Sequence, residues 1–244
     1  AASDVYKRQN LKDELWLVAG GVFGGSLYFF TENTALGITQ ASNVAFIICT
    51  APLLTTILSL LFYKSEKATK GLIYGSLLAL IGVGLVVFNG SVVLKLSPVG
   101  DLLTLLAALS WAFYSLVIKR MTGRYPTVFI TRKIFFYGVL TILPAFLLHP
   151  LQPDFDVLLQ PLVLSNLLFL AVLASLICYI LWNVVLKQLG TMRASNYIYL
   201  NPLVTMVASV LILHEQITWI TLMGAACIIL GAVSYTHLTL PTIR

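Results

Sequence analysis

The sequence predicts an all-α polytopic membrane protein, on the strength of its composition and of the way its apolar residues are grouped. Of the 244 residues, 59% are apolar and 10% are charged, whereas soluble domains average about 45–50% apolar and about 25% charged residues. A soluble core of this length cannot bury so much apolar surface. The apolar residues form continuous runs without the period-two alternation of barrel strands. The membrane-spanning segments are therefore predicted to be helices.

Eight apolar runs are candidate membrane-spanning helices. They lie at about 15–36, 42–63, 71–89, 101–119, 134–148, 164–186, 195–213 and 217–232. Most of them are long enough to cross the roughly 30 Å of hydrocarbon in a bilayer. The run at 134–148 is short and contains Pro144. Arg132 and Lys133 precede it, and we expect their charged ends to reach the membrane interface.

When successive loops are assigned to opposite sides of the membrane, most lysine and arginine residues fall on one side. That side receives eleven of them and the opposite side receives only Lys95. The eleven are Lys12, Lys64, Lys67, Lys70, Lys119, Arg120, Arg124, Arg132, Lys133, Lys187 and Arg193. Because cytoplasmic loops are enriched in lysine and arginine, we predict a multi-pass protein of the bacterial inner membrane with its N-terminal end in the cytoplasm. The net charge of +6 is assigned to these loops and not to nucleic-acid binding.

Self-comparison of the sequence finds one arrangement of residues twice. Asn33 precedes Pro52 by 19 residues, and Asn183 precedes Pro202 by 19 residues. Another trio repeats with steps of nine and seven residues, as Glu66, Gly75 and Gly82 and again as Glu215, Gly224 and Gly231. The offset between the two blocks changes only from 150 to 149. We interpret the blocks as two copies of a three-helix unit.

The loop charges of the two copies lie on opposite sides of the membrane. Loop 64–70 carries three lysines, while its counterpart around Glu215 carries no lysine or arginine. Conversely, 37–40 is uncharged, and its counterpart contains Lys187 and Arg193. The pattern indicates an inverted repeat. This is the architecture of secondary transporters, which alternate between two faces around a site near the membrane midplane.

Several short motifs, in their order and spacing, resemble the EamA-type carriers of the drug/metabolite transporter superfamily. In the first half they are Thr31-Glu32-Asn33-Thr34-Ala35-Leu36, Ala41-Ser42-Asn43 and Ala51-Pro52. In the second half they are Gly100-Asp101-Leu102-Leu103, Ser110-Trp111-Ala112-Phe113-Tyr114, Arg193-Ala194-Ser195, Leu200-Asn201-Pro202, and Glu215 with Gly224 and Gly231. The resemblance covers nearly all of 14–232. It implies two five-helix repeats with both ends of the full-length chain in the cytoplasm.

The family pattern has ten helices in two repeats of five (5+5), and this chain matches only eight of them. We therefore expect the chain to be truncated. Residues 98–232 match a second repeat of five helices, whereas 10–92 match only three helices of the first repeat. Residues 1–9 and 233–244 resemble translated adapter sequence, and we expect both to be non-native segments. The predicted fold is therefore eight transmembrane helices of an inverted-repeat transporter bundle.

Polar residues within the spans are the candidate functional residues. Glu32 is the only acidic residue well inside a predicted span, and ionisable groups there are costly and often functional. We expect Glu32 to couple transport to protons or to pair with a cationic substrate group, or else to be solvated at the outer interface. Asn33 and Asn183 are expected to join helices by hydrogen bonds or to line the substrate path. Pro52 and Pro202 are candidate hinges, with simple packing as the alternative.

An aromatic and amide set completes the predicted substrate-binding residues. Its members are Trp111, Tyr114, Tyr179, Trp182, Asn196, Tyr199 and Asn201. The resemblance implies that the helices carrying them surround a central cavity, and such a lining suits small amphiphilic solutes. Anchoring at the interface is the alternative for each residue taken singly. Two overlapping GxxxG steps at 20–25 and another at 71–75 predict close packing in the bundle, with a homodimer as the second option.

The sequence thus predicts a secondary transporter that exports small metabolites, such as amino acids, by alternating access. Its expected partners are a small-molecule solute and the lipid bilayer, with proton coupling left open, and we expect no cofactor, metal or nucleic acid. A drug or nucleoside efflux carrier is the main alternative. An intramembrane enzyme is less favoured because no metal-binding HExxH motif, P-loop or pair of intramembrane aspartates is present. A passive channel is less favoured because polar rings are lacking.

Overall fold

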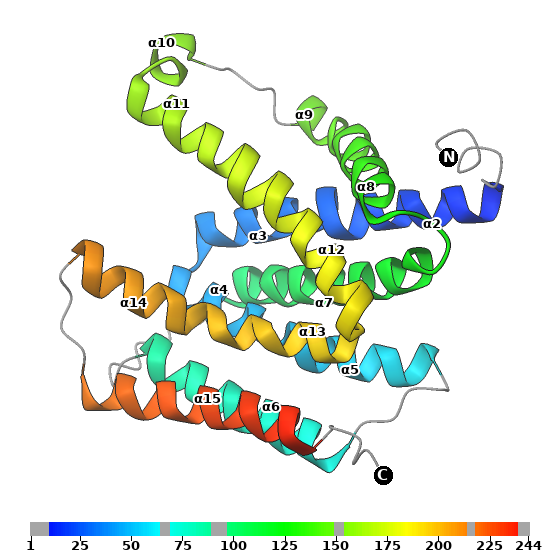
Figure 1. Cartoon of the computed structure of the whole chain (residues 1–244). Helices are drawn as coiled ribbons and strands as arrows, with labels where there is room; N and C mark the ends of the chain where they lie inside the picture. The colour runs from blue at the N-terminus through cyan, green and yellow to red at the C-terminus, as the bar shows by residue number, and fades with distance from the viewer. Residues whose placement is uncertain (1–9, 64–68, 89–96, 149–153, 214–217, 239–244) are drawn as a thin grey trace.

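A computed structural model describes residues 10–63, 69–88, 97–148, 154–213 and 218–238, and the regular structure within these ranges is helical (Figure 1). Four helical segments are long and apolar enough to cross a membrane. They are Ala41–Phe62, Lys70–Phe88, Pro98–Thr122 and Pro161–Leu189. The helical membrane class is confirmed. The count of eight spans and the repeat layout stay predictions.

The first long helical segment has a capped start and a π-helical step in its middle. It consists of α2 (Leu11–Gly21), η1 (Val22–Ser26) and α3 (Leu27–Ile38). The side-chain oxygen of Asn10 accepts a hydrogen bond from the backbone N–H of Asp13 at 2.8 Å, which satisfies one free donor of the first turn. In η1 the N–H of Leu27 donates to the carbonyl of Val22. That spacing of five residues makes the helix locally wider than an α-helix.

Both candidate hinge prolines lie at the start of a helix, directly after an interruption. The elements concerned are α4 (Ala41–Ile48), α5 (Ala51–Phe62), η3 (Tyr197–Leu200) and α14 (Asn201–Leu213). Pro52 is the second residue of α5, which follows a turn after α4. Pro202 is the second residue of α14, which follows the 3₁₀-helix η3. Proline is tolerated in a first turn because no intrahelical partner is lost there. The role of the two prolines as hinges stays a prediction.

The remaining helices complete the bundle, and glycine or proline stands next to several of their ends. They are α6 (Lys70–Phe88), α7 (Pro98–Thr122), α8 (Thr127–Ile142), α9 (Ala145–Leu148), α10 (Phe155–Leu158), α11 (Pro161–Leu168), η2 (Phe169–Ile177), α12 (Cys178–Leu189), α13 (Thr191–Asn196) and α15 (Trp219–Leu238). Pro144 lies in the turn between α8 and α9. Gly190 ends α12 with φ +80°, a conformation that favours glycine.

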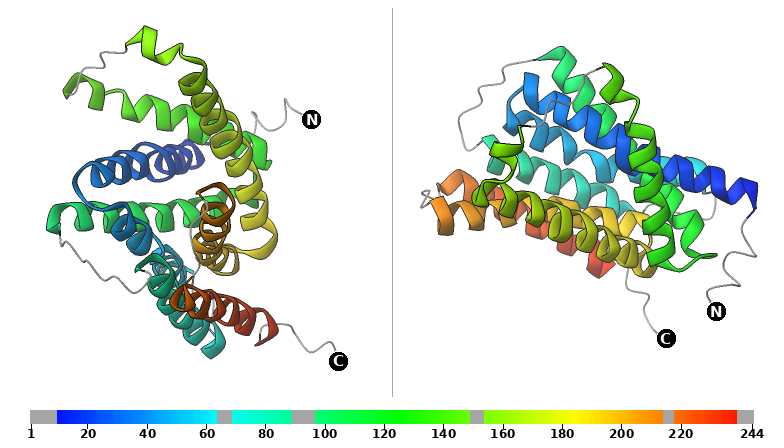
Figure 2. Two further views of the ribbon diagram at one scale, coloured as in Figure 1. Left: turned by 90° about the vertical axis from the view of Figure 1, so that its left-hand side faces the viewer. Right: turned by 90° about the horizontal axis from the view of Figure 1, so that it is seen from above.

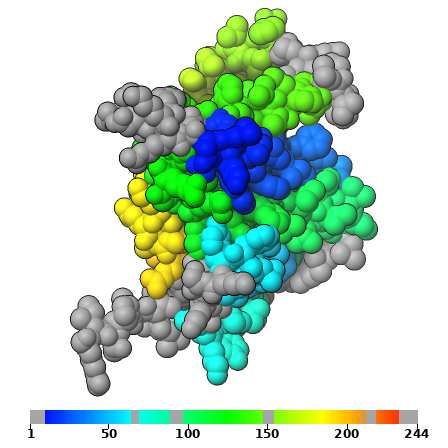
Figure 3. Space-filling view, turned by 90° about the vertical axis from the view of Figure 1, so that its right-hand side faces the viewer, coloured from blue at the N-terminus to red at the C-terminus, as the bar shows by residue number. Residues whose placement is uncertain are grey.

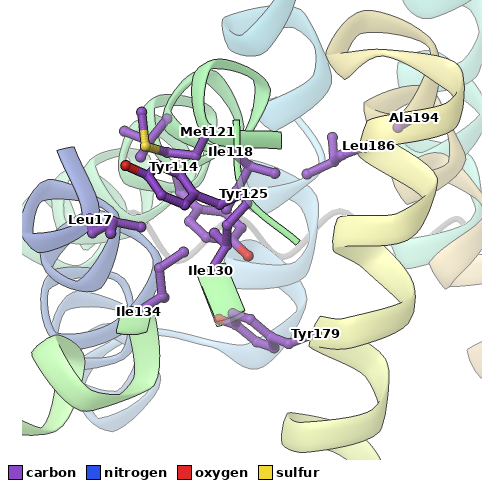
Figure 4. Packing of buried hydrophobic residues seen from close by; sticks show 11 residues of the cluster. Leu17, Tyr114, Ile118, Met121, Tyr125, Ile130, Ile134, Tyr179, Leu186 and Ala194 are labelled. Carbon is purple, nitrogen blue, oxygen red and sulfur yellow. The ribbon is translucent and has the colours of Figure 1, made fainter. Parts of the chain in front are cut away.

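Helix α7 lies near the middle of the bundle, where it packs against α2, α3, α4, α5 and α8 (Figures 1 and 2). Around it, buried side chains from several helices converge (Figure 4). Leu17 of α2, Ile134 of α8 and Tyr179 of α12 meet Tyr114 and Ile118 of α7 in one cluster. Because lipid is itself apolar, tight van der Waals packing and interhelical hydrogen bonds hold such helices together.

The predicted GxxxG steps of the first helix are used for packing inside the chain. A Cβ atom on Gly24 would lie 2.2 Å from the ring of Tyr114, and one on Gly21 would lie 2.5 Å from the Cβ atom of Tyr137. A Cβ atom on Gly25 would lie 3.0 Å from the Cα atom of Gly138. The absence of side chains at these positions lets α2 and η1 approach α7 and α8 closely.

Helices α6 and α15 form a second close pair, seen side by side at the bottom of Figure 1. A Cβ atom on Gly82 would lie 2.6 Å from the carbonyl oxygen of Gly224. A Cβ atom on Gly231 would lie 2.5 Å from the carbonyl oxygen of Gly75. Each helix therefore contributes two glycines to one backbone contact.

Several residues used in the sequence argument lie outside the described residues. They are Lys64, Glu66, Lys67, Lys95 and Glu215, together with the predicted non-native segment 1–9. Of the predicted segment 233–244, residues 233–238 continue α15. Their being native or foreign stays a prediction.

Candidate substrate site

Seven aromatic rings meet where α3, α7, α8 and α12 cross, and we call them the aromatic cluster. They are Tyr28, Phe29, Trp111, Tyr114, Phe135, Tyr179 and Trp182. Trp111 is central, with its ring centroid 5.2 Å from those of Tyr28 and Tyr114. The centroids of Tyr179 and Trp182 lie 5.8 Å from that of Trp111. These separations are typical of attractive tilted and edge-on ring pairs.

A buried chain of hydrogen bonds fixes one side of the aromatic cluster. The hydroxyl of Tyr114 donates to Oδ1 of Asn183 at 2.7 Å, and Nδ2 of Asn183 donates to Oγ1 of Thr131 at 2.9 Å. All three residues are at most 2% exposed. Asn183 therefore joins α12 to both α7 and α8, as expected of a polar residue that holds membrane helices together.

Two donors in the aromatic cluster have no hydrogen-bond partner among the described residues. They are the indole nitrogens Nε1 of Trp111 and of Trp182, and both atoms are buried. Almost all buried polar groups in proteins are paired, because an unpaired donor costs about 1–3 kcal/mol. Two unpaired donors on neighbouring rings are therefore candidates for contact with a bound acceptor group.

Glu32 is half-buried on α3 and touches the aromatic cluster through Tyr28. The hydroxyl of Tyr28 donates to Oε1 of Glu32 at 2.9 Å. The two residues are one helical turn apart, so the helix itself sets this contact. The aromatic cluster thus has a carboxylate beside it as well as two unused N–H donors.

Four of the predicted substrate-binding residues lie apart from the aromatic cluster. Asn33 is exposed, and its Nδ2 donates to the carbonyl of Phe29 in its own helix at 2.8 Å. Asn196 is buried and accepts a hydrogen bond from Ser76 of α6 at 3.3 Å. Tyr199 is buried in a separate apolar group with Cys49, Val83 and other residues. Asn201 is exposed at the start of α14. The structure brings together Glu32, Trp111, Tyr114, Tyr179, Trp182 and Asn183.

An apolar cavity of about 220 Å³ adjoins the aromatic cluster between η1 and α8. Gly24, Gly25 and Gly138 form part of its wall, together with the rings of Phe29 and Phe135. The small wall residues leave the space, and each of the two rings also lies beside Tyr179 of the aromatic cluster. Phe29 and Phe135 therefore face both the cavity and the aromatic cluster.

Ion pairs join α2 to α7 and α8 at the end of the bundle that carries Lys119, Arg120, Arg124, Arg132 and Lys133, which we call the basic end. Asp13 is 3% exposed. Its carboxylate accepts from Nη1 of Arg124 at 2.7 Å and from the hydroxyl of Tyr125 at 2.9 Å. Figure 3 looks onto this end and shows the dark-blue start of α2 at the surface, beside green segments of α7 and α8. Burial, together with the Asp13 contact, raises the pKa of Tyr125 to about 12.

The second ion pair at the basic end connects Glu14 to Lys133. Nζ of Lys133 lies 2.6 Å from Oε1 of Glu14, which also accepts a hydrogen bond from Tyr137. Burial alone would raise the pKa of Glu14, but the hydrogen bonds from Lys133 and Tyr137 and the Lys133 charge lower it below its ordinary value. The same contact raises the pKa of Lys133. Each partner thus holds the other in its charged form.

Comparison with known proteins agrees with the helical membrane architecture. A model of the EamA-like transporter family matches residues 2–88 and 98–236. The "Uncharacterized transporter YyaM" of Bacillus subtilis is 28% identical over 239 residues, which are 93% of this chain and 73% of that protein. The "Probable amino-acid metabolite efflux pump" of Salmonella typhimurium is 28% identical over 179 residues, which are 70% of this chain and 59% of that protein.

A solved structure shares the fold at low sequence identity. Its TM-score is 0.77 at 20% identity, and the likeness covers 95% of this chain and 78% of the other. The arrangement of helices is therefore one already seen by crystallography.

Proposed function

The chain belongs to the EamA-like transporter family, and from this premise we propose that it exports small metabolites such as amino acids across the bacterial inner membrane. The aromatic cluster carries the proposal. It combines ring surfaces, two buried indole donors without partners and a nearby carboxylate. A relative is named "Probable amino-acid metabolite efflux pump", which supports the choice of amino acids. Homologues are named as transporters or efflux pumps, so this is the class of function to test first.

In the proposed site the solute lies against Trp111, with its acceptor group on the indole N–H donors. A carboxylate suits this position because hydrogen bonds to a charged acceptor are about twice as strong as neutral ones. An amino group would then lie toward Glu32 and the ring faces, where cations are attracted. Asn183 and Tyr114 are placed to fix the ring positions through their mutual hydrogen bond.

Alternating access between inverted repeats is the proposed mechanism, and the α6–α15 contact supports it. The repeat offset of 149 makes Gly75 equivalent to Gly224 and Gly82 equivalent to Gly231. Gly82 contacts Gly224, and Gly75 contacts Gly231. When Gly75 is exchanged with Gly224 and Gly82 with Gly231, the Gly82–Gly224 contact becomes the Gly75–Gly231 contact, and the reverse. A two-fold axis that relates the two repeats requires this symmetry. Such an axis lies in the membrane plane in carriers with inverted repeats.

Uptake of a panel of radiolabelled amino acids into proteoliposomes that contain the protein tests the site. Trp111→Phe and Trp182→Phe each keep a ring and remove one N–H donor, so the apparent KM should rise about tenfold or more while the protein still folds. Trp219→Phe is the matched control, because Trp219 is 83% exposed on α15. An unchanged KM in both cluster variants contradicts the proposed site. Transport of nucleosides or cationic drugs in place of amino acids favours the alternative carrier classes.

Glu32 is the proposed coupling residue for protons. Glu32→Gln should abolish the extra solute accumulation that an imposed pH gradient drives, because the amide does not ionise. Accumulation should then equal that measured by solute counterflow in the absence of a pH gradient. Asp156→Asn is the control, since Asp156 is exposed on α10. If Glu32→Gln leaves gradient-driven accumulation unchanged, Glu32 does not couple transport to protons.

A further inference from the structure

The two π-helical segments occupy equivalent positions in the proposed repeats. η1 covers Val22–Ser26 and η2 covers Phe169–Ile177. Adding the offset of 150 to η1 gives 172–176, which lies wholly inside η2. π-helical turns are rare and occur mostly as single bulges at functional sites. Their recurrence at one repeat position indicates that the wide turn is a feature of this helix in both copies.

Side chains from two other helices bind carbonyl groups of η1. Oγ of Ser110 on α7 donates to the carbonyl of Phe23 at 2.9 Å. The hydroxyl of Tyr179 on α12 donates to the carbonyl of Gly24 at 2.7 Å. Since a wide turn displaces carbonyls from the regular i to i+4 ladder, side-chain donors are well suited to hold it. Ser110 and Tyr179 are 1% and 6% exposed, so water does not compete freely for these bonds.

η2 lacks the equivalent bonds within the part of the chain that the structure describes. No residue of η2 is buried there, and no described side chain donates to its carbonyls. The repeat counterpart of Tyr179 is residue 29, which is phenylalanine and has no hydroxyl. The rings of Phe29 and Tyr179 lie 6.5 Å apart between their centroids. At this repeat position the first copy therefore has a phenylalanine, whereas the second has a tyrosine whose hydroxyl binds η1.

We propose that η1 is a conformational hinge held by the hydrogen bonds from Ser110 and Tyr179. Because Tyr179 also belongs to the aromatic cluster, movement of its ring would release the hinge when a solute enters or leaves. The coupling of the Tyr179 ring to solute binding rests on the proposed function. The stabilisation of η1 by the two hydrogen bonds does not. Tyr179 is in this respect a positioning residue, which links the site to the backbone of α2–η1–α3.

Hydrogen–deuterium exchange of the full chain in lipid nanodiscs, without added solute, tests the held hinge. With Tyr179→Phe, amide exchange in a peptide covering 20–28 should be about fivefold faster, as expected for the loss of one hydrogen bond that opposes local opening. Ser110→Ala should give an increase of similar size in the same peptide. Exchange in peptides from η2 and from the α6–α15 pair should stay unchanged.

Ser115→Ala is the matched control, because the Ser115 hydroxyl donates to the carbonyl of Trp111 in its own helix, at 3.0 Å, and not to η1. It should leave the 20–28 peptide unchanged. Unchanged exchange in 20–28 for both Tyr179→Phe and Ser110→Ala overturns the proposal. Faster exchange spread evenly over all peptides also overturns it, since that result identifies a merely structural role. Because this readout needs no substrate, it stands whether or not amino-acid transport is found.

Discussion

The segments α2–η1–α3 and α11–η2–α12 have the same place in the two proposed repeats but very different surroundings. The first buries residues along its whole length, from Asp13 to Ala35. The second shows only 11% burial in its most apolar window, and α11 and η2 bury no residue. The difference follows the neighbouring helices. α7 and α8 cover the first segment, where Gly20, Gly21 and Gly24 let them approach at backbone distance. The main contacts of α11 and η2 are with each other and with α10 and α12, their neighbours along the chain.

The largest expected difference between the two segments comes from adding the same side chain to each. Gly24→Val places a Cβ atom 2.2 Å from the fully buried ring of Tyr114, so overpacking should cost about 3 kcal/mol. For a chain of this size that lowers Tm by roughly 6–12 °C. Ala174→Val, at the exposed counterpart, should leave Tm within about 1 °C. Thermal unfolding of the purified protein, followed by size-exclusion fluorescence, measures both. Equal losses would contradict the contrast in packing.

The two segments also differ at their starts. Asp13 ties α2 to Arg124 and Tyr125, whereas 161–164 offers only apolar side chains. Asp13→Asn should cost about 2 kcal/mol, because a buried charge-assisted pair is lost while Arg124 stays half-exposed to water. The same Tm measurement should show a decrease of about 5 °C. Asp156→Asn, on an exposed helix, is the control and should change nothing. A stable Asp13→Asn variant would show that the basic end does not depend on this pair.

The sequence alone predicted the helical membrane class, the close-packing glycines of the first helix and six residues that meet at one site. These features depend on hydropathy, residue size and polar residues within apolar runs, all of which are local. The π-helical turns were not predicted, because Val22–Ser26 and Phe169–Ile177 share no residue pattern that marks such a turn. The role of Asp13 was missed for a different reason. Its partners lie 111 and 112 residues away, and only the packing of α2 against α7 and α8 brings them together.

The separation of the predicted site residues has a similar physical origin. Asn33 and Asn183 are equivalent in sequence, yet Asn183 is buried between α7 and α8 while Asn33 turns back to its own helix. Position in a repeat fixes the residue type but not the neighbouring helices. Asn196 and Tyr199 lie on the α6 side of the bundle. They are near Asn183 in the sequence, but the fold places them away from the site.

The smallest expected effect is the pH-dependent contribution of the Glu14–Lys133 pair to folding stability. This pair, too, has no counterpart at the start of α11. The lowered pKa of Glu14 means that its contribution to stability is present above its ordinary pKa of 4.5 and is lost as the pH falls through the lowered pKa. The raised pKa of Lys133 means that the contribution is lost again only at strongly alkaline pH. Between these limits the pair, being partly exposed, should contribute about 0.5 kcal/mol.

This contribution is measurable as the slope of Tm against pH between about 3 and 6. Glu14→Gln should flatten the slope, Lys133→Gln should flatten it nearly as much, and the double variant should lose no more than either alone, because all three remove the same interaction. An undiminished slope in Glu14→Gln would assign the acid sensitivity to other carboxylates, of which Asp13 is the nearest. If the two single variants instead add, Glu14 and Lys133 contribute independently. The basic end would then be held by Asp13 and its two partners, and the contrast with α11 would rest on one ion pair.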